Sequence, residues 1–174
     1  MPRRHPEARS ARPGGRVSVR RVRPDGDTGD IVGWVLRSDP DRLVLRDRRG
    51  SVHDLRWEDV LAWRPVGVPR GRDPLRTSRD ELDRHALPGS GGRVFVARLS
   101  SLLDGRTPAI LDDPGDPPPF PAALSGEWVS AGEAGDYVAL AWWAAHHDAR
   151  SMQVRTPTPS RIEQLRVLGF VELP

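Results

Sequence analysis

The sequence predicts two small domains, a five-stranded β-barrel followed by an α+β module. A chain of 174 residues is long enough for two small domains. From about residue 16 to 67, apolar and polar residues alternate with the period of two that is typical of β-strands. The final fifty residues instead combine short strand patterns with helical ones. We therefore expect a mixed fold with a domain boundary between residues 67 and 78.

Short apolar runs separated by turn residues fill residues 16–67. Asp25-Gly26-Asp27, Asp39-Pro40-Asp41 and Arg48-Arg49-Gly50 carry turn chemistry, and Trp57 begins a segment with the length of one 3₁₀ turn. Five short strands with a 3₁₀ turn before the last strand are the plan of an SH3-like barrel. The residues expected inside it are Val19, Ile31, Val35, Val44 and Leu45.

The remaining segments differ clearly in composition. Residues 1–15 have almost no aliphatic side chains, which predicts a disordered basic tail, and residues 68–77 are expected to form a linker. The second module, residues 78–174, opens with the capping box of Ser78 and Glu81 and includes a proline-rich loop at 112–121. Its last part predicts a β-α-β-α-β order, with strands at 127–129, 152–154 and 170–173 and helices at 133–147 and 159–168.

Composition narrows the classes of function. The chain has no cysteine, which excludes disulfides, thiolate nucleophiles and Cys-based zinc sites. It has no apolar run of the roughly 18 residues that a membrane span requires, and its arginine-rich start lacks the apolar segment of a secretory signal. We therefore expect a cytoplasmic protein with no membrane partner.

Positive charge is concentrated in the first half of the chain. Residues 1–76 hold 18 arginines and 11 acids, whereas residues 77–174 hold 9 arginines and 13 acids. This asymmetry predicts that a polyanion, either nucleic acid or an acidic protein, would meet the N-terminal half. All 27 basic residues are arginine, a bias that a GC-rich genome also produces. The predicted ligand-binding surface consists of Trp57, expected to be exposed, with Arg46, Arg48 and Arg49.

Three motifs in the second module suggest a family. The run ALAWWAAHHDAR, then SMQV, then PSRIEQLRVLGF resembles the C-terminal part of the GNAT acetyltransferases, where a long helix, a strand and a helix ending in Leu-Gly-Phe follow one another. Together with the predicted barrel, the chain resembles a group of bacterial GNAT enzymes described as histone acetyltransferases. The resemblance implies an acetyl-CoA-dependent N-acetyltransferase. It also implies that Gly132 and Gly135 bind the cofactor's pyrophosphate at the start of the long helix.

The sequence departs from that family at two functional positions. Glu133 brings a negative charge to the glycine loop, and Leu165 to Leu168 occupy the place where many members carry a tyrosine acting as general acid. We therefore expect a minimal or catalytically degenerate relative, and no catalytic residue is assigned. The alternative is a non-catalytic binding module that acts through its basic barrel. No metal site is expected, because His146 and His147 point about 100° apart on a helix.

Overall fold

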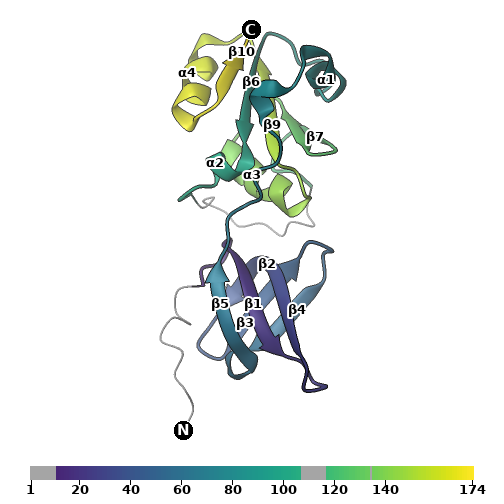
Figure 1. Cartoon of the computed structure of the whole chain (residues 1–174). Coiled ribbons are helices and arrows are strands. Elements are labelled where there is room, and N and C mark those ends of the chain that lie inside the picture. Colours follow the sequence, from purple (N-terminus) through teal and green to yellow (C-terminus); the bar gives the residue numbers. More distant parts are fainter. Residues whose placement is uncertain (1–10, 107–116, 134) are drawn as a thin grey trace. The chain divides into compact units, whose positions relative to one another are not determined.

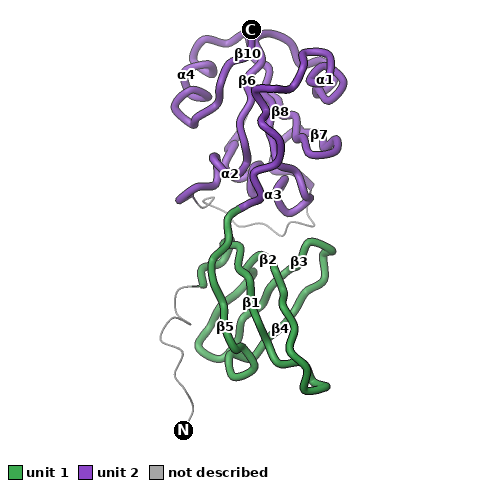
Figure 2. Tube along the Cα trace, viewed as in Figure 1, with its two compact units in different colours: residues 1–67 green, residues 68–174 purple. Residues whose placement is uncertain are grey.

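The computed structural model describes residues 11–106, 117–133 and 135–174 and separates into two units, residues 1–67 and 68–174 (Figures 1 and 2). The first ten residues of the predicted tail lie outside the described residues, as do residues 112–116 of the predicted proline-rich loop. No helix in the described part of the chain is long and apolar enough to cross a membrane.

Unit 1 is a single antiparallel sheet with the strand order β4-β3-β2-β1-β5. Two register shifts bend it, one in the β1–β5 pairing at Arg20/Arg21 and one in the β2–β3 pairing at Val35/Arg37. Its elements are β1 (Arg16–Val22), β2 (Thr28–Ser38), β3 (Arg42–Asp47), β4 (Val52–Arg56), the 3₁₀ turn η2 (Trp57–Asp59) and β5 (Val60–Pro65).

The predicted closed SH3-like barrel is wrong. The strands and the 3₁₀ turn occur in the expected order, but β4 and β5 are the two edges of the sheet, and no ladder joins them within the described residues. Closure requires hydrogen bonds between the first and last strands of the order. A sequence pattern that locates strands one by one carries no information on that pairing, and for this reason the prediction failed.

The core of unit 1 lies on one face of the curled sheet. Val19, Val35 and Leu45 are buried there as expected, and Ile31 is half-buried against them. Val44 belongs to the other face, because its neighbours Leu43 and Leu45 both point into the core.

The last residues of the predicted tail take part in this unit. Ala11 is buried in the core, and the backbone of Gly14 and Gly15 exchanges hydrogen bonds with Val35 of β2. These contacts order residues 11–15 at the edge of the core.

Unit 2 contains a mixed sheet with the order β10-β6-β9-β8-β7, in which β8 and β9 are parallel and the other pairs are antiparallel. Figure 1 shows α4 beside β10 and α3 next to α2. Its elements are η3 (Pro74–Arg76), α1 (Arg79–Arg84), β6 (Arg93–Arg98), α2 (Leu99–Leu102), β7 (Ala122–Ser125), β8 (Trp128–Ala131), α3 (Tyr137–His146), β9 (Ser151–Thr156), α4 (Pro159–Leu168) and β10 (Val171–Leu173).

The predicted GNAT-like C-terminal half is also wrong. The last fifty residues do contain strand, helix, strand, helix and strand in succession, but they join a five-stranded sheet rather than a separate half-domain. β6 lies between β9 and β10, so the terminal strand pairs antiparallel with β6. The physical reason is that Val94 to Ala97 of β6 are all buried, which requires a central position with both faces covered.

Candidate functional site

The outer face of the sheet in unit 1, opposite the core, carries a row of basic and aromatic side chains. The register aligns Arg16 of β1 with Trp34 of β2, and Trp34 in turn with Arg46 of β3. Directly opposed residues on one face have Cβ atoms about 5 Å apart. Arg16 and Arg46 therefore lie on either side of Trp34, which is only 7% exposed.

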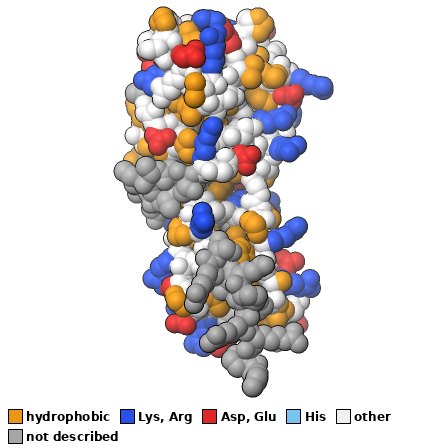
Figure 3. All heavy atoms as spheres, turned by 90° about the vertical axis from the view of Figure 1, so that its left-hand side faces the viewer, with side chains coloured by type: hydrophobic (Ala, Val, Ile, Leu, Met, Phe, Trp, Pro, Cys, Tyr) orange, Lys and Arg blue, Asp and Glu red, His pale blue; other side chains and the backbone are white. Residues whose placement is uncertain are grey.

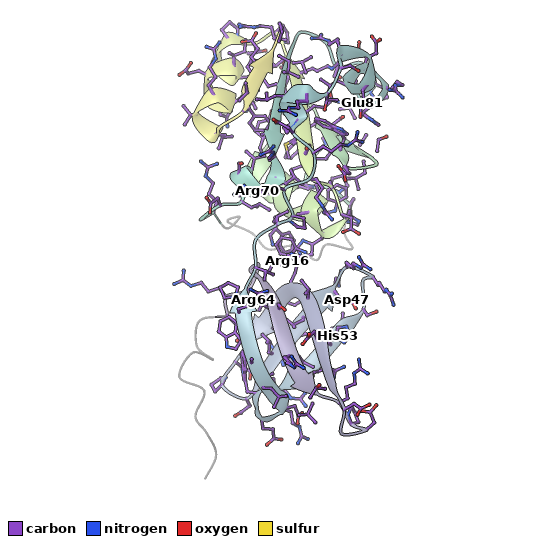
Figure 4. All side chains as sticks on the ribbon, viewed as in Figure 1. Arg16, Asp47, His53, Arg64, Arg70 and Glu81 are labelled. Carbon is purple, nitrogen blue, oxygen red and sulfur yellow. The ribbon has the colours of Figure 1, made fainter. Side chains whose placement is uncertain are left out.

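Two more arginines lie on the same face, in β1 and β5. Arg20 is four positions after Arg16 in β1, and Arg64 of β5 is aligned with Ser18, which lies between them. Figure 4 shows Arg16 and Arg64 on neighbouring strands, and the Arg16 guanidinium donates a hydrogen bond to the Gly67 carbonyl. We call Arg16, Arg20, Arg46 and Arg64 the arginine face. Among the residues that the register aligns directly with these four arginines, the acidic one is Asp30, which lies opposite Arg20.

Some acids of unit 1 lie in turns, where their carboxylates accept hydrogen bonds from backbone N–H groups. Asp25 accepts from the amide of Asp27, and Asp39 accepts from those of Asp41 and Arg42. These hydrogen bonds lower the pKa of Asp39. These carboxylates are thus engaged at turns, whereas Asp30 in β2 and Asp54 in β4 lie within the sheet.

The hairpin between β3 and β4 presents the predicted residues Arg48 and Arg49. Both are exposed, and Asp47 shapes their turn by accepting hydrogen bonds from the amides of Arg49 and Ser51. The second carboxylate oxygen of Asp47 lies 2.9 Å from His53 Nε2 (Figure 4), and this side-chain hydrogen bond is the largest cause of the lowered pKa of Asp47. Arg46 is in the adjoining strand, so the structure brings these three predicted arginines together.

Trp57, expected as the exposed aromatic of this surface, is instead buried. Its side chain is 7% exposed, packs edge-to-face against Trp63 and donates its indole N–H to the Asp39 carbonyl at 3.0 Å. It follows β4 at the end opposite to the Arg48–Arg49 hairpin. The physical reason is that η2 turns the ring into the core, where it covers more apolar surface than it could outside.

An open hollow of about 460 Å³ lies beside η2 and is lined by Pro40, Asp41, Arg42, Arg56, Trp57 and Glu58. Its two arginines are engaged in ion pairs, Arg42 with Asp54 at 2.6 Å and Arg56 with Glu58 at 3.0 Å. The hollow therefore offers no concentrated charge to a ligand.

In unit 2, the predicted cofactor residues Gly132 and Gly135 lie in the loop between β8 and α3. A Cβ on Gly132 would meet only ordinary contacts, but one on Gly135 would lie 2.2 Å from the Phe120 ring, and Gly135 has φ +109°. Phe120 packs on Tyr137, whose burial raises its pKa and whose hydroxyl donates to the Gly132 carbonyl at 3.0 Å. Gly135 is thus explained by packing inside the unit.

Two carboxylates occupy the place where the predicted pyrophosphate would bind. Asp136 caps α3 and accepts hydrogen bonds from the amides of Val138 and Ala139. Glu133 accepts hydrogen bonds from the hydroxyls of Thr156 and Thr158 at the start of α4. The amides that would hold a phosphate are therefore already bound to a carboxylate, which also repels an anion.

His146 and His147 lie against the tryptophans one turn earlier in α3, Trp142 and Trp143, with ring centroids 4.1 and 4.6 Å apart. No group of three or more potential ligands suited to a metal occurs among the residues that the structure describes.

Sequence reasoning missed Arg16, Trp34 and Arg64 as members of one surface. The alternation Arg16-Val17-Ser18-Val19-Arg20 was the available signal, because in a strand it places both arginines opposite the core. The alignment with Trp34 and Arg64 depends on strand register, which this alternation leaves open.

Comparison with known proteins does not assign the chain to a family. No protein-family model matches the chain, and a search of curated proteins found no match. The resemblance to acetyltransferases therefore stays a prediction.

Proposed function

We propose that unit 1 is a nucleic-acid-binding module that holds phosphates through the arginine face. The observation that carries this proposal is the alignment of Arg16 and Arg46 on either side of Trp34, with Arg20 and Arg64 on the same face. This proposal corresponds to the non-catalytic binding module that the sequence suggested as the alternative to an acetyltransferase. The proposal includes a cytoplasmic location, where nucleic acid is accessible.

The arrangement of charge supports binding to a polyanion. Three arginines outside the arginine face form ion pairs within unit 1, Arg37 with Asp39, Arg42 with Asp54, and Arg56 with Glu58. Arg20 and Arg64 are exposed. Figure 3 shows Lys and Arg side chains, all of them arginine in this chain, as several separate blue groups on one face.

The spacing of the arginines also suits a phosphate backbone. Strand geometry places Arg16 and Arg20 about 13 Å apart along β1, and Arg16 and Arg46 about 10 Å apart across two strand spacings. Duplex DNA carries a charge about every 1.7 Å of its axis. The exposed Arg20 and Arg64 can therefore each meet a phosphate. The guanidinium fork makes two parallel hydrogen bonds to such a group.

The size of the salt dependence follows from this number of contacts. Each neutralised phosphate on duplex DNA releases about 0.9 counterion, so the two contacts of Arg20 and Arg64 give a log-log slope of about −1.8. Raising salt from about 50 to about 200 mM should then weaken binding about 12-fold. A single nonspecific contact would change affinity only about threefold over the same range.

The test measures fluorescence polarisation of a labelled duplex of about 20 base pairs with the full chain at several salt concentrations. The Arg20→Gln, Arg64→Gln double variant should lower the slope by about 1.8 units. The control is Arg79→Gln, Arg84→Gln on α1, which removes the same net charge from unit 2.

Three results would overturn the proposal. Absence of binding at about 50 mM salt would show that the arginines do not form a phosphate site. An equal loss in the control double variant would show that net charge, rather than the arginine face, is responsible. Competition by polyglutamate as strong as that by unlabelled duplex would identify an acidic protein as the partner class instead.

A further inference from the structure

We infer that unit 1 has a second anion site, in which Arg21 and Arg23 of the β1–β2 hairpin bind a phosphate group that bears two negative charges. This site is separate from the arginine face. Arg20 and Arg21 are consecutive residues of β1, and consecutive side chains of a strand point to opposite faces of the sheet. The inference therefore goes beyond the proposed function and does not depend on it.

Arg21 lies at the end of the face that carries the core. The continuous register of β1 and β2 aligns Val19 with Ile31 and Arg21 with Gly29, so Arg21 follows Val19 on the same face. In β5, the residue aligned with Arg21 is Val60, which is buried in the core. The Arg21 side chain is therefore half-buried at the margin of the core.

Gly29 allows a second arginine to reach the same place. A Cβ on Gly29 would lie 2.5 Å from Nε of Arg23 and 2.8 Å from its Nη2, so this guanidinium fills the space that a side chain of residue 29 would take. Gly29 is directly opposite Arg21, and the Cβ atoms of opposed residues on one face are about 5 Å apart. The Arg23 side chain thus extends back along the hairpin and brings its charge next to Arg21.

Neither guanidinium has an acidic partner within the part of the chain that the structure describes. No ion pair involves Arg21 or Arg23 there, and Nε of Arg21 is shielded from solvent without a hydrogen-bond acceptor. The carboxylate of Asp25, in the adjoining turn, accepts a hydrogen bond from the Asp27 amide instead. Two like charges held together, one of them partly shielded from water, cost free energy. An anion bound by the N–H groups that remain accessible would offset that cost.

The two side chains together favour a phosphate with two charges. A guanidinium donates two parallel hydrogen bonds to the oxygens of a phosphate or a carboxylate. A phosphate monoester carries about −1.5 to −2 charges at neutral pH, which matches two guanidinium groups better than the single charge of a carboxylate or a phosphodiester. Both a small phosphorylated molecule and the phosphorylated 5′ end of a nucleic-acid strand present this group.

The experiment titrates the full chain with inorganic phosphate and follows the Nε–H signals of its arginines by NMR. At about 50 mM salt, where exposed charges are only partly screened, we expect a Kd of about 1 mM or tighter and a shift of the Arg21 signal. Arg23→Gln should weaken binding about tenfold, because it removes one charged donor group. Gly29→Ala keeps both charges but takes the space of the Arg23 guanidinium, so it should also weaken binding.

Two control variants are matched to these changes. Arg49→Gln removes the same charge from the exposed β3–β4 hairpin, and Gly67→Ala adds a Cβ that meets no atom within 4 Å. Both should leave the Kd for phosphate within about twofold of the unmodified chain. A loss as large in Arg49→Gln as in Arg23→Gln would overturn the inference, because net charge alone would then explain binding.

Two further results would also overturn the inference. One is the absence of binding up to about 20 mM phosphate, and the other is equally tight binding of dimethyl phosphate, which carries a single charge. The source of the phosphate follows from a labelled duplex with and without 5′ phosphates. Tighter binding of the phosphorylated duplex, lost in Arg23→Gln, supports the site with a strand end as its ligand. Equal binding of both duplexes by a chain that binds inorganic phosphate supports the site with a small phosphorylated molecule as its ligand.

Discussion

Replacing Gly33 by alanine should destabilise unit 1, because this glycine lies where two strands approach closely. A Cβ at this position would lie 2.7 Å from the backbone oxygen of Arg46 in β3. Backbone atoms in a hydrogen-bonded ladder cannot move aside as the end of a flexible side chain does. The alanine must therefore push β2 and β3 apart.

The expected loss follows from the cost of overpacking. Inserting one methyl group into a closely packed site typically costs about 1 to 3 kcal/mol. In a domain of this size, each kcal/mol lowers the midpoint of thermal unfolding by about 4 to 8 °C. A mid-range loss of about 2 kcal/mol therefore corresponds to a shift of about 8 to 16 °C.

Differential scanning calorimetry of the full chain measures the shift, and amide exchange assigns it to the β2–β3 ladder. The matched control is Gly67→Ala, since a Cβ there meets no atom within 4 Å. That substitution should change stability by less than about 0.5 kcal/mol or raise it slightly. If Gly33→Ala also stays within about 0.5 kcal/mol of the unmodified protein, the close approach does not constrain this position and the reasoning is refuted.

Three further results are expected. With Asp47→Asn, the free energy of unfolding should fall less steeply in acid. The hydrogen bond from His53 lowers the folded pKa of Asp47. The stability that the Asp47 carboxylate contributes is therefore present above the unfolded pKa of about 3.9 and is lost as pH falls through the lower folded value. Urea unfolding at several pH values measures this, and identical acid slopes in both proteins would contradict it. Trp57→Phe should cost about 0.5 to 1.5 kcal/mol in the same assay through loss of the indole hydrogen bond, and an unchanged midpoint would show that this bond adds nothing. Calorimetric titration with acetyl-CoA should give a Kd weaker than about 1 mM, because Glu133 and Asp136 occupy the phosphate position, whereas micromolar binding would restore the acetyltransferase prediction.

Local features of the fold could be predicted from the sequence because they depend on residues close together in the chain. Alternation located β1 and assigned Val19 to the core. Turn chemistry located the hairpins, and the capping box predicted the start of α1, where the Ser78 hydroxyl accepts a hydrogen bond from the Glu81 amide. Each of these signals spans at most a few residues, so no tertiary contact is needed to read it.

The candidate site was predictable only in part. Arg46, Arg48 and Arg49 belong to one strand and its hairpin, so the sequence alone places them together. Trp57 was assigned to the wrong side of the sheet, because a residue in a 3₁₀ turn has no alternation that shows which way its side chain points.

Tertiary structure decided which strands are neighbours and how they align. The sequence by itself determined where strands and turns occur, and that arginines alternate with valines in β1. Only the folded sheet aligned Trp34 with Arg16 and Arg46, left β4 and β5 as open edges, and placed β6 between β9 and β10. The physical reason is that register and strand order are set by hydrogen bonds between residues distant in the chain, and a shift of one residue turns every side chain of a strand to the other face.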